Sequence, residues 1–262
     1  ASLLTRYHQA RASLDSLNRM MSLPVEREPG KKFLHRPTFK GAIEFKNITF
    51  SYPEQPVKAL DNISFKIKAG ERVGFIGRIG SGKSTIEKLM MGLYEAQEGS
   101  ILVDGTDIRQ VDPSDLRRQI GYVPQDISLM FGSVKDNITL GSRFADDALI
   151  LRAAEISGVT NFVNKHPAGF DLPVGERGSA LSGGQRQSIA VARALLLSPP
   201  IFIMDEPSNS MDNSTEEAFK QRFSNSLSSQ TLILVTHKAS LLELVDRLIV
   251  MDGSKIVADG EK

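Results

Sequence analysis

The stretch Arg72–Ser84, RVGFIGRIGSGKS, decides how the rest of this sequence is interpreted. Its part GRIGSGKS (77–84) fits the pattern G-x-x-x-x-G-K-[ST] at every invariant position. An apolar, strand-like run precedes the pattern, and TIEKLMMGL (85–93), which favours a helix, follows it. A glycine-rich turn between a strand and a helix lets backbone N–H groups surround a polyphosphate. This context predicts a phosphate-binding loop rather than an accidental glycine turn.

Residues of this loop have distinct expected roles. Glycine at positions 77, 80 and 82 lets the backbone curl around phosphates without Cβ clashes. The helix that follows contributes unsatisfied N–H groups and a positive dipole end. We expect Lys83 to reach the β- and γ-phosphates and the Ser84 hydroxyl to ligate Mg²⁺.

Short apolar runs predict a parallel sheet around the loop. RVGFIG (72–77), IFIM (201–204) and TLILV (231–235) are almost wholly apolar, which suits strands buried on both faces. In contrast, AIEFKNITFSY (42–52) and NISFKIK (62–68) alternate apolar and polar residues, as half-buried antiparallel strands do. The sequence therefore predicts an α/β core with an antiparallel β subdomain.

Two hairpins and a helical insertion are also expected. LVDGTDI (102–108) and VMDGSKIV (250–257) place Asp-Gly between strand-like runs, which is a hairpin signal. The region from about 126 to 182 is mostly helical in pattern, for example ADDALILRAAEISG (145–158). We interpret that region as a helical subdomain inserted in the α/β core.

The first 41 residues form a separate region of helix and linker. Apolar residues recur at alternating steps of three and four, as in a heptad seam, at Leu3, Tyr7, Ala10, Leu14, Leu17 and Met21. Pro24 is expected to stop this helix, and Pro29, Gly30, Lys31, Lys32, Arg36 and Pro37 indicate an exposed linker. The helix either docks on its own domain or is the tail of a longer helix.

Composition excludes several classes of function. The 262 residues include 32 Lys+Arg and 31 Asp+Glu, so nothing in the net charge favours a nucleic-acid partner. The absence of cysteine excludes disulfides and thiolate metal sites. No apolar run approaches the ~20 residues that a membrane-spanning helix needs.

Two acidic residues follow the apolar run IFIM. Two adjacent carboxylates at the end of a buried strand are energetically unfavourable unless they face a cation or water. Asp205 is expected to hold Mg²⁺, and Glu206 is expected to polarise an attacking water as a general base. The alternative is a solvated strand end before a turn at Pro207.

A second glycine pair lies in LSGGQRQSIAVARALLL (181–197). Ser182, Gly183 and Gly184 open a run of good helix formers, which is again how proteins hold phosphate on backbone N–H groups. The chain therefore carries two segments that suit phosphate binding.

In their order, GRIGSGKS, LSGGQ and IFIMDEP resemble the nucleotide-binding domain of ATP-binding cassette (ABC) proteins, and LSGGQ is highly specific to them. The resemblance covers roughly residues 42–260. Four smaller landmarks also match: Tyr52 in FSYP, Gln125 in GYVPQD, Asp212 in SNSMD and His237 in LILVTH. Taken singly, these would be a surface aromatic, a loop amide, a helix N-cap and a structural histidine.

The resemblance implies a P-loop NTPase (RecA-like) core and an ATPase. Two copies would sandwich two ATP molecules, each between the P-loop of one copy and the LSGGQ of the other. The implied catalytic residues are Glu206, His237 and Lys83. Mg²⁺ would be held by Ser84, Gln125 and Asp205. The implied nucleotide contacts are Tyr52, Gly77, Arg78, Ile79, Gly80, Ser81, Gly82, Lys83, Ser84, Thr85, Gln125, Ser182, Gly183, Gly184, Gln185 and Asp212.

Segments outside these motifs are similar to exporters. Residues 174–178 (VGERG) resemble the X-loop, in which Glu176 would touch a transmembrane domain, and residues 1–41 resemble the end of such a domain. GRIGSGKST and SNSMD look most like type I secretion ATPases of the inner membrane's cytoplasmic face, which imply a periplasmic adaptor and an outer-membrane channel. The alternatives are an exporter of lipid, peptide or drug, a soluble ABC ATPase and an ATP-gated dimerisation switch. An intact Glu206 disfavours the last.

Overall fold

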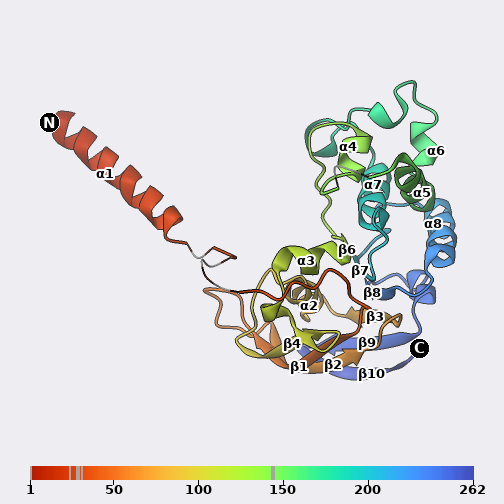
Figure 1. Ribbon diagram of the computed structural model, residues 1–262, viewed down its shortest axis with the longest axis horizontal. Coiled ribbons are helices and arrows are strands. Elements are labelled where there is room, and N and C mark those ends of the chain that lie inside the picture. The colour runs from red at the N-terminus through yellow and green to blue at the C-terminus, as the bar shows by residue number, and fades with distance from the viewer. Residues whose placement is uncertain (1, 24, 28–29, 31, 143–144) are drawn as a thin grey trace. The chain divides into compact units, whose positions relative to one another are not determined.

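The computed structural model describes residues 2–23, 25–27, 30, 32–142 and 145–262 (Figure 1). The chain divides into two compact units, Ala1–Phe33 and Leu34–Lys262. The first contains the predicted helix, α1 (Ser2–Met21), along which Leu3, Leu14 and Leu17 of the seam are exposed. Pro24, Pro29 and Lys31, predicted to stop the helix and to form the linker, lie outside the described residues. Among the helices of the described part, none is long and apolar enough to cross a membrane.

The described residues of the second unit form two sheets. One has four strands in the order β2-β1-β4-β5, and the other has six in the order β10-β9-β3-β8-β7-β6. The strands are β1 (Ile43–Phe50), β2 (Leu60–Ile67), β3 (Arg72–Gly77), β4 (Glu98–Val103), β5 (Thr106–Asp107), β6 (Ile120–Val123), β7 (Ile201–Asp205), β8 (Thr231–Val235), β9 (Arg247–Asp252) and β10 (Lys255–Glu261).

The smaller sheet is the predicted antiparallel subdomain. β1 pairs antiparallel with β2 and with β4, and alternate side chains of β1 and β2 are buried. Phe45 lies opposite Phe65, and their rings stack with centroids 4.5 Å apart. Both Asp-Gly hairpins are confirmed, because β4 pairs antiparallel with β5 and β9 with β10.

The larger sheet confirms the predicted parallel core. β3 pairs parallel with β8 and β9, and β7 pairs parallel with β6 and β8. Every residue of β7 and β8 is buried, which explains why these runs carry no polar alternation. Parallel strands end at one edge, where an α/β sheet binds its ligand. The ends of β3, β7 and β8 therefore bring the phosphate loop, Asp205 and the residues after Val235 to the same edge.

Helices cover the sheets and build the predicted helical region, which stands above the sheets in Figure 1. Buried apolar residues of α4 and α5, which lie in that region, belong to the same core cluster as those of α7, which follows it. The helices of this unit are α2 (Lys83–Met90), α3 (Pro113–Arg118), α4 (Val134–Ile138), α5 (Asp147–Ser157), α6 (Thr160–Val163), α7 (Gly183–Leu195) and α8 (Asn213–Ser226). Short 3₁₀ turns span Ile108–Gln110, Gly169–Asp171, Glu176–Gly178 and Leu241–Leu244.

The compact unit begins earlier than the expected boundary between residues 41 and 42. The backbone N–H of Leu34 donates to the carbonyl of Gln110 at 2.7 Å. Phe39 is buried in the core, and the Thr231 hydroxyl donates to the Gly41 carbonyl at 2.8 Å. The part of the predicted linker from Leu34 onward therefore packs as part of the second unit.

Candidate nucleotide site

The phosphate loop joins β3 directly to α2. Gly77 has a φ of 149° and Gly82 a φ of 103°, which is the left-handed region that side chains disfavour. A Cβ at Gly77 would lie 2.0 Å from the carbonyl oxygen of Met251, and one at Gly82 would lie 2.6 Å from that of Ala59. Both glycines are therefore required by conformation and by close packing.

Lys83 turns back into the loop that precedes it. Its Nζ donates to the carbonyls of Gly77 at 2.8 Å and Arg78 at 2.9 Å, and the side chain is buried. Burial lowers the pKa of Lys83, against the opposing effect of the carboxylates of Asp205 and Glu206. The loop therefore holds a cation at its centre beside a helix N-terminus, which is an arrangement suited to a polyphosphate.

Ser84 and Asp205 meet at the strand ends. The Ser84 hydroxyl donates to Oδ2 of Asp205 at 3.0 Å, and Asp205 is only 4% exposed. Burial raises the pKa of Asp205, while the Ser84 hydrogen bond lowers it. A hydroxyl and a carboxylate are oxygen ligands of the kind that Mg²⁺ prefers, so these two residues fit the predicted metal site. Among the described residues, Gln125 is exposed and makes no hydrogen bond to either group.

Glu206 lies beside this pair, with its carboxylate held by the loop after β8. Its Oε1 accepts from the backbone N–H of His237 at 2.9 Å, and its Oε2 accepts from the Thr236 hydroxyl at 3.1 Å. The His237 ring is about half exposed, with Nε2 3.9 Å from Oε1. The structure thus brings the predicted base and the predicted histidine together. Thr236 was not predicted from the sequence, because a threonine beside a histidine is too common to indicate a functional residue.

Tyr52 lies next to the helix of the phosphate loop. Its hydroxyl is 3.1 Å from the hydroxyl of Thr85, and its ring makes edge contacts with Phe50 and Tyr94 at centroid distances of 5.0 and 5.2 Å. Lys88 Nζ lies 5.3 Å from the Tyr52 ring centroid. The half-buried ring belongs to a small aromatic cluster, of which Tyr94 was not predicted from the sequence.

The LSGGQ segment begins α7 as predicted, with Ser182 as its N-cap. The Ser182 hydroxyl accepts from the Gln185 N–H at 3.2 Å, and the Gln185 side chain accepts from the Ser182 N–H at 2.9 Å. This capping box orients the first turn and leaves the N–H groups of Gly183 and Gly184 at the helix end. Within the described parts of the chain, no hydrogen bond or ion pair joins Ser182–Gln185 to the phosphate loop.

Asp212 caps α8. Its carboxylate accepts from the Thr215 N–H at 2.8 Å and from the hydroxyls of Ser214 and Thr215. The hydrogen bond from Ser214, followed by those from Thr215, lowers the pKa of Asp212 to about 2. The helix-cap interpretation, which the sequence left open, describes what Asp212 does within the chain.

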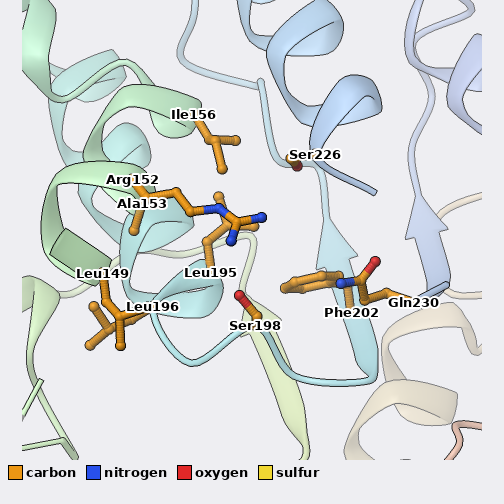
Figure 2. Close-up of a pocket in the computed structure, with 10 residues that line it drawn as sticks. All are labelled: Leu149, Arg152, Ala153, Ile156, Leu195, Leu196, Ser198, Phe202, Ser226 and Gln230. Carbon is orange, nitrogen blue, oxygen red and sulfur yellow. The ribbon is translucent and has the colours of Figure 1, made fainter. Parts of the chain in front are cut away.

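A separate pocket lies away from these residues (Figure 2). It is lined from α5, from the end of α7 and the residues after it, from β7, from the last residue of α8 and from Gln230 just before β8. The Arg152 guanidinium extends into its middle. None of the residues predicted to contact nucleotide or metal lines this pocket.

The fold and the site together define a nucleotide-binding P-loop domain in which two adjacent carboxylates, Asp205 and Glu206, lie at the end of β7. The family model described as ABC transporter matches residues 60–209. The chain therefore belongs to the ABC transporter family. This confirms the resemblance and the fold class that were predicted from the sequence. The nucleotide that this family implies is ATP.

The relatives are longer proteins. The chain is 39% identical over 261 residues to the leukotoxin translocation ATP-binding proteins LktB of Mannheimia haemolytica and Bibersteinia trehalosi. These matches cover 100% of this chain and 37% of each relative. A solved structure of a bacterial Atm1-family ABC exporter with ATP bound matches with a TM-score of 0.88 and 33% identity, over 97% of this chain and 44% of that one.

Proposed function

We propose that this chain binds and hydrolyses ATP to power the export of a protein substrate by type I secretion. The observation that carries the hydrolysis is the convergence of Lys83, Ser84, Asp205 and Glu206 at one edge of the parallel sheet. The protein substrate is inferred from relatives that are described as leukotoxin translocation proteins and that share 39% identity with this chain.

Binding would use the phosphate loop and the aromatic cluster. The N–H groups of residues 77–84 and the ammonium of Lys83 would hold the β- and γ-phosphates, and Tyr52 would stack on the adenine. Mg²⁺ held by Ser84 and Asp205, with Gln125 as a further ligand, would neutralise phosphate charge.

Hydrolysis would use Glu206 and His237. A carboxylate oxygen of Glu206 would accept the proton of the attacking water, and that carboxylate is already oriented by Thr236 and by the His237 N–H. The exposed ring of His237 would contact the γ-phosphate. Because the carboxylate has two oxygens and more than one lone pair on each, holding it by hydrogen bonds still leaves it able to accept a proton.

A second copy of this chain would complete each site. The start of α7 offers a serine hydroxyl and N–H groups, but it makes no bond to its own chain's phosphate loop among the described residues. In a head-to-tail dimer, Ser182, Gly183 and Gly184 of one copy would hold the γ-phosphate bound by the other. ATP would close this dimer and hydrolysis would reopen it.

The remaining partners follow from the exporter assignment. A transmembrane domain would contact the exposed Glu176, which lies in the 3₁₀ turn Glu176–Gly178 where Arg177 has a φ of 51°. The chain would then act at the cytoplasmic face of the bacterial inner membrane, together with a periplasmic adaptor and an outer-membrane channel.

The test is Glu206→Gln. The variant should bind ATP with unchanged affinity and lose hydrolysis by about 10²–10⁴-fold, the range of a general base. Glu217→Gln, an exposed change on α8, serves as the control. In cells, the Glu206→Gln change in the gene encoding this chain should stop the release of a secreted protein. Near-normal ATP turnover would remove Glu206 from the base role, and continued secretion would refute the export proposal.

A further inference from the structure

Gln187 is a buried side chain in the second turn of α7, and it connects three parts of the site. It is 1% exposed. Its Nε2 donates to the backbone carbonyl of Glu206 at 2.8 Å, and its Oε1 accepts from the backbone N–H of Ser210 at 2.8 Å. One amide therefore holds the peptide of the predicted base and the loop 207–212 that follows it.

The backbone of Glu206 needs such support. Its φ is 48°, in the left-handed region that residues other than glycine rarely adopt. Its N–H donates to the Val235 carbonyl at 2.8 Å, and its own carbonyl accepts from the N–H of Asn209 at 3.1 Å as well as from Gln187. The direction of the Glu206 carboxylate therefore depends on the groups that hold this peptide.

The same loop lies directly on the start of α7. A Cβ at Gly183 would be 2.9 Å from the Cβ of Ser210, and one at Gly184 would be 3.1 Å from the Ser210 carbonyl oxygen. Gly183 and Gly184 at the start of the helix and Gln187 one turn later thus all contact Ser210 of the loop. The start of α7, the loop 207–212 and the Glu206 peptide are packed and hydrogen-bonded as one unit.

We propose that Gln187 is a positioning residue that couples the start of α7 to the carboxylate of Glu206 in the same chain. The proposal rests on the proposed function, in which Ser182 of α7 contacts one nucleotide of the dimer and Glu206 acts on the other. A displacement of α7 by the first nucleotide is then transmitted through Gln187 to the base that serves the second.

The first test compares Gln187→Met with Gln221→Met, a matched change at an exposed glutamine of α8. Amide hydrogen exchange of residues 206–212 should accelerate in Gln187→Met and stay at the wild-type rate in Gln221→Met. The kcat for ATP should fall on the order of 10²-fold, the effect of misplacing a catalytic group, while KM stays unchanged. If Gln187→Met fails to fold, Gln187→Glu replaces it, because its carboxylate still accepts from Ser210 but offers no donor to Glu206.

The second test uses mixed dimers in which one copy carries Glu206→Gln, so that only the other copy's base acts. Gln187→Met should abolish most activity when it is in the copy with the intact Glu206, and should have little effect in the other copy. The proposal would be overturned if ATPase activity were lost when Gln187→Met is in the copy that carries Glu206→Gln. It would also be overturned if Gln187→Met left both the amide hydrogen exchange of residues 206–212 and the kcat unchanged. A wild-type chain without ATPase activity would refute the proposed function instead, and the exchange measurement would still decide the role of Gln187.

Discussion

Glu216 offers a sharp test of how the loops around the site are held. Glu216 is 6% exposed, and its carboxylate accepts from the Ser208 hydroxyl at 2.6 Å, from Lys238 Nζ at 2.5 Å and from the Ser240 hydroxyl. Lys238 Nζ also donates to the Ser208 carbonyl at 2.9 Å. The network joins α8 and the loop after β7 to the loop after β8, which carries His237.

The perturbation is Glu216→Gln, which keeps the shape and removes the charge. Breaking a buried ion pair costs about 3–5 kcal/mol, but the Lys238 side chain is 31% exposed and therefore partly solvated. With that screening, we expect the free energy of unfolding to fall by about 2 kcal/mol at pH 7.

The same network predicts a pH dependence. Burial raises the pKa of Glu216, but the hydrogen bonds from Lys238, Ser208 and Ser240 outweigh it, so the pKa lies below its ordinary value. A carboxylate whose folded pKa is lowered stabilises the fold above its unfolded pKa of about 4.3, and this stabilisation is lost as the pH falls through the folded pKa. The difference in the free energy of unfolding between the wild type and Glu216→Gln should be constant near neutrality and shrink below about pH 4.3.

The assay is urea unfolding of the wild type, Glu216→Gln and Glu217→Gln, from pH 7 down to the lowest pH at which the wild type stays folded. Glu217 is the matched control, because it is the neighbouring residue on α8 and its side chain is 51% exposed. A Glu216→Gln deficit no larger than that of Glu217→Gln, or one that stays constant down to the lowest pH, would refute the reasoning.

Three further predictions concern the dimer and the start of α7. ATPase activity should rise more steeply than linearly with protein concentration, because a weak dimer limits it; a strictly linear titration would contradict the shared site. In mixed dimers, Ser182→Arg should block hydrolysis at the partner's phosphate loop, and loss confined to its own loop would contradict the assignment in trans. Gly183→Ala should lower stability by about 1–3 kcal/mol in thermal unfolding, because its Cβ would crowd Ser210, although alanine is the better helix former; an unchanged or raised Tm would argue against this packing.

Much of the fold follows from short-range patterns. Strands buried on both faces are nearly continuous apolar runs, and β3, β7 and β8 lie where RVGFIG, IFIM and TLILV, respectively, predicted them. Alternation predicted β1 and β2, and Asp-Gly pairs predicted two hairpins. The packing of Phe39 and the hydrogen bond to Gly41 depend on distant residues that no local pattern reveals.

What the sequence alone determined is the chemistry of single segments: a glycine-rich phosphate loop, carboxylates at a strand end, and a capped helix that presents glycine N–H groups. The tertiary structure decided which of these groups meet. Parallel strands place the Ser84 hydroxyl beside Asp205 and the Thr236 hydroxyl beside Glu206, although each pair is far apart along the chain. Gln187 and Glu216 carry no sequence signal of their own, because a buried polar side chain takes its role from the partners that the fold brings within hydrogen-bonding distance.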